Sequence, residues 1–241
     1  MSKDTFNITF NAKTAPHFES IQHASETGIA PYTLNRGLYG KEVGGEMVEG
    51  YDALMPHFQE NSLSDWISFL ENSQLGRSSV TDLGYGTGQF LLDIADTPNI
   101  DCVGYGRSEY ARLELPDSHI APTHKLLTAK DNISLIEGDL PFSPDQIPTD
   151  SQDMILANNV FLYLTPQEQI KTITNILTSL KNGGVCLLNQ LGLDDRDITL
   201  TLLENGLSQQ DYEIAESDNP NIGKTLAFRK IVASEVSQIP R

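Results

Sequence analysis

The chain has 241 residues, of which 39% are hydrophobic and 20% are charged. This length and composition predict one packed α/β domain with a modest additional segment, and they argue against global disorder. The net charge of −17 would repel a phosphate backbone, which argues against nucleic acid as the usual partner. We interpret the acidity first as a solubilising surface, and a protein substrate with a basic tail stays open.

The cysteines and the N-terminal residues favour a reducing compartment. Cys102 and Cys186 each lie in an apolar run typical of a strand, which predicts buried thiols and neither a disulfide nor a metal site. Residues 1–11 lack the apolar stretch of a signal peptide, and no run approaches membrane-spanning length. The chain is therefore predicted to be cytoplasmic, with no membrane partner and no bound metal.

A boundary is predicted near Gly76, where helical patterns give way to alternating strands and helices. In residues 1–75, apolar side chains recur at helical spacing, as in Leu63, Trp66, Ile67 and Leu70. We expect this part to form a helical cap or lid over a second unit, residues 76–241.

Five short apolar runs follow, separated by helical patterns. The predicted strands are Val80–Leu83, Cys102–Tyr105, Ile133–Ile136, Met154–Leu156 and Val185–Leu188. Strands that alternate with helices predict a parallel sheet with right-handed crossovers. Two further strands, Asp211–Ala215 and Thr225–Ile231, are expected to pair as an antiparallel hairpin, with turn residues at Asp218–Asn221.

The clearest helix is predicted over Pro166–Lys181. Thr165 is a favourable N-cap, and Glu168, three residues later, completes a capping box. The helix is expected to end before Gly183–Gly184.

The most informative segment joins the first predicted strand to a helix. It carries glycine at three alternate positions, Gly84, Gly86 and Gly88, with Asp82 two residues before them. Glycine lets backbone N–H groups approach a ligand closely, and the carboxyl end of a strand is where open α/β sheets bind ligands. A dinucleotide fingerprint would place its third glycine at position 89, where this chain has Gln89.

This loop resembles motif I of the class I S-adenosylmethionine-dependent methyltransferases, and three later segments resemble that family in the same order. They are Glu137-Gly138-Asp139, Ile147–Leu156 and Leu180–Gly184. The resemblance covers about residues 79–231 and implies a seven-stranded, mostly parallel Rossmann-like sheet with an antiparallel C-terminal hairpin. It implies S-adenosylmethionine as the cofactor. The residues expected to bind it are Asp82, Gly84, Tyr85, Gly86, Gly88, Tyr105, Gly106, Arg107, Asp139, Leu140 and Asn158.

The chain departs from the family at the end of the second strand, where Gly106 replaces the acid that holds both ribose hydroxyls. Three explanations stay open: Glu109 substitutes for the acid, tight cofactor binding has been lost, or Arg107 accepts a phosphorylated ribose. If the acid alone is missing, Gly106→Asp should raise affinity for S-adenosylhomocysteine about tenfold. A positive φ at residue 106 would oppose that gain.

The resemblance implies methyl transfer to a small-molecule acceptor by in-line displacement, for which the protein supplies mainly positioning. The alternative is a non-catalytic, methyltransferase-like binding module. Candidate groups for orienting or deprotonating the acceptor are His17, Tyr51, His57, Asn158 and Tyr163.

Overall fold

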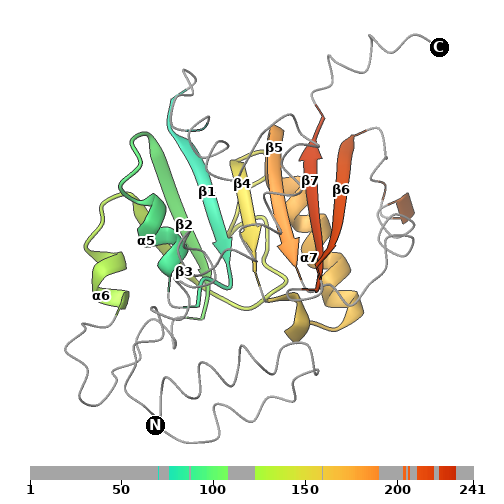
Figure 1. Cartoon of the computed structure of the whole chain (residues 1–241), viewed down its shortest axis with the longest axis horizontal. Coiled ribbons are helices and arrows are strands. Elements are labelled where there is room, and N and C mark those ends of the chain that lie inside the picture. The colour runs from blue at the N-terminus through green and yellow to red at the C-terminus, as the bar shows by residue number, and fades with distance from the viewer. Residues whose placement is uncertain are drawn as a thin grey trace, which may run out of the picture.

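Seven strands form a single sheet in the computed structural model (Figure 1). The structure describes residues 70, 76–86, 88–107, 123–158, 160–189, 203–204, 206, 211–219 and 223–231. The strands are β1 Ser78–Leu83, β2 Ile100–Gly106, β3 Ile133–Glu137, β4 Gln152–Ala157, β5 Leu180–Asn189, β6 Tyr212–Asn219 and β7 Gly223–Lys230. The principal helices are α5 Gln89–Ile94, α6 Thr123–Thr128 and α7 Pro166–Ser179, with a short 3₁₀ turn at Phe161–Tyr163.

The order across the sheet is β3-β2-β1-β4-β5-β7-β6. Strands β1 to β5 pair in parallel, whereas β7 is antiparallel to both β5 and β6. Strand β1 therefore lies between β2 and β4, and the chain reverses its direction of travel across the sheet at this point. The predicted fold class, a mostly parallel sheet with an antiparallel C-terminal hairpin, is confirmed.

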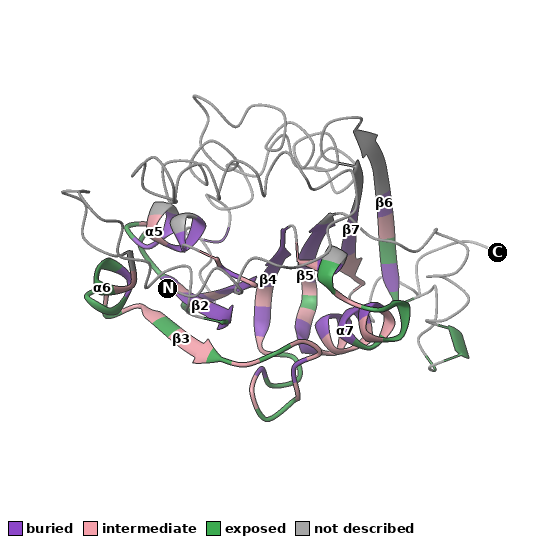
Figure 2. Cartoon of the chain, turned by 90° about the horizontal axis from the view of Figure 1, so that it is seen from below, coloured by how far each residue is buried: buried purple, intermediate pink, exposed green. Residues whose placement is uncertain are grey.

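The core has two layers, one on each face of the sheet. Helices α5 and α6 cover one face and α7 covers the other (Figure 2). The first layer packs Leu91 and Leu127 against Val80, and the second packs Ile173 and Ile176 against the opposite face. Because both faces are covered, β1, β4 and β5 carry buried apolar residues on both faces, which is why short continuous hydrophobic runs mark them in the sequence.

The two cysteines lie in opposite core layers and are buried thiols, as predicted. Cys102 belongs to the layer beneath α5 and Cys186 to the layer beneath α7. Burial raises the pKa of the Cys102 thiol to about 12 and also raises the pKa of Cys186. Both side chains therefore act as small apolar groups.

Helix α7 begins as predicted but ends earlier. The Thr165 backbone N–H donates to Glu168 Oε2 at 2.8 Å, and the Glu168 N–H donates to Thr165 Oγ1 at 3.4 Å, which completes the capping box. The predicted end at Lys181 is wrong, because Leu180 already has extended backbone angles and begins β5. Gly183 and Gly184 lie inside β5, where the register with β4 shifts between Gln152 and Met154.

The C-terminal hairpin is longer than predicted. Asp218 and Asn219, expected in the turn, still pair with Lys224 and Gly223 in the ladder. The residues that join the two strands, 220–222, lie outside the described residues.

The predicted helical cap stays a prediction, because of residues 1–75 the structure describes only Leu70. Leu70 is helical and buried in the layer beneath α5, and its carbonyl oxygen accepts a hydrogen bond from Ser78 Oγ at 3.0 Å. None of the helices that the structure describes has the length and apolar character needed to span a bilayer.

Candidate functional site

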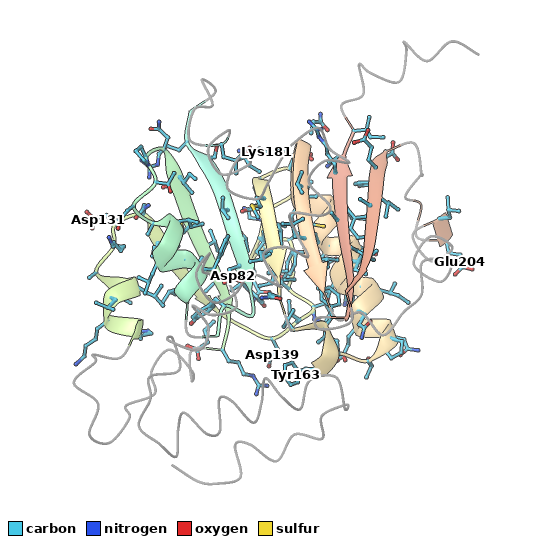
Figure 3. The ribbon with its side chains drawn as sticks, in the orientation of Figure 1. Asp82, Asp131, Asp139, Tyr163, Lys181 and Glu204 are labelled. Atoms are coloured by element: carbon cyan, nitrogen blue, oxygen red, sulfur yellow. The ribbon has the colours of Figure 1, made fainter. Side chains whose placement is uncertain are left out.

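The candidate site lies at the carboxyl ends of β1 to β4. In an open α/β sheet the ligand crevice forms outside the carboxyl ends of two adjacent strands whose connections run in opposite directions across the sheet. Here the strand order reverses next to β1, between β1 and β4. Asp82, Asp139 and Tyr163 gather at this end of the sheet, and Lys181 marks the opposite end (Figure 3). The predicted residues of β1, β2 and the loop after β3 are therefore brought together.

The glycine loop between β1 and α5 has left-handed backbone at all three glycines. The φ angles are 70° at Gly84, 51° at Gly86 and 76° at Gly88. Residues with a Cβ adopt this region only at a cost of about 1–2 kcal/mol each, so three such positions in five residues explain the alternate glycines of the sequence.

Two of these glycines also lack room for a side chain. A Cβ on Gly84 would lie 2.7 Å from Val160 Cγ2, and one on Gly88 would lie 2.4 Å from Leu127 Cδ1. The loop is therefore pressed between the segment after β4 and helix α6. Its shape is determined by packing as well as by backbone angles.

Asp82 is a carboxyl group buried at the end of β1. The residue is 1% exposed, and its Oδ2 atom has no hydrogen-bond partner among the described residues. Burial raises the pKa of Asp82 to about 8, so in the ligand-free protein the neutral form predominates at pH 7. A buried polar atom without a partner is costly, so Asp82 Oδ2 is suited to accept a hydrogen bond from a donor outside the described residues, such as a ligand.

Gly106, at the end of β2, packs directly against the glycine loop. Its φ is 150°, and a Cβ on it would lie 3.2 Å from Gly84 Cα. The Gly84 N–H donates to the Tyr105 carbonyl oxygen at 2.7 Å, which holds the two segments together. An acid at residue 106 would therefore be strained in this backbone.

Arg107 and Asp139 form an ion pair across the ends of β2 and β3. Arg107 Nε donates to Asp139 Oδ1 at 2.7 Å, and both side chains are exposed. The guanidinium lowers the pKa of Asp139, so this carboxylate stays charged throughout the neutral range.

Tyr105 is buried and positions the loop after β3. Its hydroxyl donates to the Asp139 carbonyl oxygen at 2.9 Å and lies 3.2 Å from Gln146 Oε1. Its ring packs edge-on against Phe142 with centroids 5.8 Å apart. A Cβ on Gly138 would lie 2.3 Å from the Tyr105 hydroxyl oxygen, which explains the glycine of the Glu137-Gly138-Asp139 segment. Tyr105 therefore holds the loop after β3 in position.

The end of β4 carries the remaining described candidates. Asn158 is 5% exposed and directly follows β4, whereas Tyr163 is 44% exposed in the 3₁₀ turn. Tyr85 is buried beneath the glycine loop, and Leu140 is half-buried after Asp139. Among the described residues, no three His, Cys, Asp or Glu side chains are grouped so that they could hold a metal ion. His17, Tyr51, His57 and Glu109 lie outside the described residues.

Two further residues at this edge of the sheet are given no role in the site by the sequence analysis. Val160 limits the space above Gly84, and Glu137 is the register partner of Gly106 on β3. Glu137 is part of a segment that the sequence analysis singled out, but only the pairing of β2 with β3 shows which residue lies beside Gly106.

No family model matches the chain. It is 28% identical over 153 residues to a carboxy-S-adenosyl-L-methionine synthase from Nautilia profundicola, a match that covers 63% of this chain and 60% of that protein. The chain thus spans about 60% of the length of the curated relative it matches.

Solved structures of similar fold include several methyltransferases. An O-methyltransferase family protein from Burkholderia thailandensis superposes with a TM-score of 0.46 and 13% identity, covering 77% of this chain and 59% of that one. An S-adenosylmethionine-dependent methyltransferase from Aquifex aeolicus gives a TM-score of 0.42 and 14% identity, covering 70% of this chain and 90% of that one.

Proposed function

We propose that this chain binds S-adenosylmethionine at the carboxyl ends of β1 to β4 and transfers its methyl group to a small-molecule acceptor. The observation that carries the proposal is the glycine loop, with three left-handed glycines beside a buried carboxyl group at the point where the strand order reverses. The motif resemblance and the similarity to a carboxy-S-adenosyl-L-methionine synthase support the same ligand.

The residues present are suited to this ligand. Its amino-acid part carries an ammonium group, which is the kind of donor that Asp82 Oδ2 would accept, since this atom has no partner among the described residues. The glycine loop offers backbone N–H groups without side chains in front of them. Asp139, kept charged by Arg107, is a suitable acceptor for the amino group of an adenine ring.

When bound, S-adenosylmethionine supplies an activated methyl group. The chain's own contribution is to hold the ligand, to orient the acceptor and to keep water away. Asn158 and Tyr163 follow β4 and are the described polar residues suited to orienting an acceptor. An acceptor that must lose a proton would also need a base, for which the residue pool includes His17, Tyr51 and His57.

A small-molecule acceptor agrees with the charge of the chain. With 33 acidic residues against 16 Lys and Arg residues, the surface field repels phosphate backbones. Nucleic acid is therefore the less favoured acceptor, and a small cationic or neutral molecule is favoured.

A second candidate function comes from the relative, whose name gives it a carboxy derivative of S-adenosylmethionine as the product. In that case S-adenosylmethionine would be a substrate that leaves the site modified, and no methyl group would be transferred. The two candidates share the binding site and differ in the product.

One experiment distinguishes methyl transfer, formation of a carboxylated product, and ligand binding without catalysis. The full chain is titrated calorimetrically with S-adenosylmethionine and S-adenosylhomocysteine, and the chain is then incubated with S-adenosylmethionine and a metabolite extract. Mass spectrometry that finds S-adenosylhomocysteine and a methylated acceptor supports methyl transfer. S-adenosylmethionine heavier by one carboxyl group supports the second candidate. Binding without any product supports the binding module, and no binding of either ligand contradicts the proposed site.

A further inference from the structure

The end of β2 leaves the ribose of the proposed ligand without its usual partner. Gly106 has no side chain, and a Cβ there would make a tight 3.2 Å contact with Gly84 Cα. A carboxylate acceptor for the ribose hydroxyls would therefore come from another position in the chain. The pairing between β2 and β3 identifies one.

Glu137 is the last residue of β3 and the register partner of Gly106. The pairs Cys102↔Ile133, Gly104↔Leu135 and Gly106↔Glu137 follow one another along these two strands. Adjacent parallel strands lie about 4.8 Å apart, and directly paired residues direct their side chains to the same face. A side chain from Glu137 therefore starts one strand spacing away from the missing side chain of Gly106.

The face in question is the one that carries the glycine loop. A Cβ on Gly104 would lie 2.8 Å from both Leu135 Cδ2 and Leu91 Cδ1, so Leu135 reaches over Gly104 toward helix α5. Glu137 is two residues beyond Leu135 and shares its face. Asp82 pairs with Gly104 from the other side, so Asp82 and Glu137 lie on either side of the glycine-only end of β2.

The three carboxyl groups at this edge differ in their surroundings. Asp82 is buried, whereas Asp139 and Glu137 are exposed. The Glu137 side chain is one methylene longer than that of an aspartate. That extra length suits a carboxylate that has to reach across from the next strand.

We propose that Glu137 accepts the ribose hydroxyls of the ligand, in place of the acid that the family carries at the end of the second strand. This inference rests on the proposed function, because it needs an adenosine ligand in the site. Glu137 thereby acts as a specificity residue: it favours ligands with a ribose diol over those without one. A carboxylate that accepts two hydroxyls contributes more than a neutral hydrogen bond does.

The test measures recognition of the diol itself. The full-length chain is titrated calorimetrically with S-adenosylhomocysteine and with its 2′,3′-dideoxy analogue. The variants are Glu137→Gln, Glu137→Ala, Glu109→Gln and, as a matched control, Glu204→Gln, which removes an exposed carboxylate at the far edge of the structure (Figure 3). Thermal unfolding of each variant shows that it is folded.

We expect the wild-type chain and Glu204→Gln to prefer S-adenosylhomocysteine over the dideoxy analogue by tenfold or more, taking about tenfold per charge-assisted interaction. Both Glu137 variants should bind S-adenosylhomocysteine about tenfold more weakly and the analogue unchanged, so that the preference disappears.

Three results would overturn the inference and leave the proposed function in place. They are an undiminished preference in the Glu137 variants, a preference lost only in Glu109→Gln, and a wild-type chain that binds the two ligands equally. A wild-type chain that binds neither ligand would overturn the proposed function and this inference together.

Discussion

The end of β2 and the start of the glycine loop are packed backbone against backbone, at Gly106 and Gly84. A Cβ on Gly106 would lie 3.2 Å from the Cα atom and 3.4 Å from the nitrogen of Gly84. Val160 packs close to Gly84 as well, since a Cβ on Gly84 would lie 2.7 Å from Val160 Cγ2. The loop is therefore enclosed between the ends of β2 and β4, and a change on either side is transmitted to it.

The first prediction concerns the missing ribose acid. Because φ at residue 106 is 150°, a region that only glycine adopts readily, Gly106→Asp should lower the free energy of unfolding by about 1–3 kcal/mol. It should not give the tenfold gain in S-adenosylhomocysteine affinity that the sequence alone suggests. Denaturant unfolding and calorimetry measure the two effects. The control is Gly183→Asp, where φ is 80° and open space surrounds the position, so that the strain occurs without the contact. A stable Gly106→Asp protein with higher affinity would contradict this prediction.

The difference between the two expectations shows what the sequence can and cannot reveal here. The glycine loop, the strands and the start of α7 are local patterns, in which turn chemistry, apolar runs and a capping box act over a few residues. The early end of α7 at Ser179 depends on the pairing of Leu180 with Gln152, which no local pattern contains. The backbone angle of Gly106 and its pairing with Glu137 likewise depend on contacts between segments distant in sequence.

The second prediction uses the buried carboxyl group of Asp82. Its pKa is about 8 in the folded chain and about 4 in an unfolded one. Between these values the folded state holds a proton that the unfolded state has lost, so stability falls as the pH rises, by up to about 1.4 kcal/mol per pH unit. This contribution is fully present below pH 4 and is lost as the pH rises through about 8. Asp82→Asn should remove the slope.

Unfolding of wild type and Asp82→Asn between pH 4 and pH 9 tests this expectation. The unfolding free energy of Asp82→Asn minus that of the wild type should increase steadily up to about pH 8 and then stay constant. Asp145→Asn removes an exposed carboxylate and serves as the control. Parallel pH profiles for wild type and Asp82→Asn would show that the pKa of Asp82 is not raised in the folded chain.

The third prediction separates backbone strain from ligand contact in the glycine loop. Gly86→Val and Gly183→Val both place a branched side chain at positive φ, 51° and 80° respectively, and each should lose about 1–2 kcal/mol of stability. Only Gly86 lies in the proposed site, so only Gly86→Val should reduce S-adenosylhomocysteine affinity beyond detection. Equal affinity in a folded Gly86→Val protein would mean that the ligand does not approach the loop.

The last prediction concerns the exposed ion pair of Arg107 with Asp139. Because both side chains are in water, Arg107→Gln and Asp139→Asn should each change the unfolding free energy by less than about 1 kcal/mol. Ligand affinity should respond differently. Asp139→Asn should weaken S-adenosylhomocysteine binding about tenfold, since it removes the charged acceptor proposed for the adenine amino group. Arg107→Gln should weaken it less, and the double variant should bind like Asp139→Asn alone, because Arg107 then acts only by holding Asp139 in place and in its charged form.

Calorimetry on the four proteins gives this coupling directly. If the two losses instead add, Arg107 contacts the ligand independently of Asp139. Binding of NADPH by the wild-type chain that is lost in Arg107→Gln would then assign that contact to a ribose phosphate.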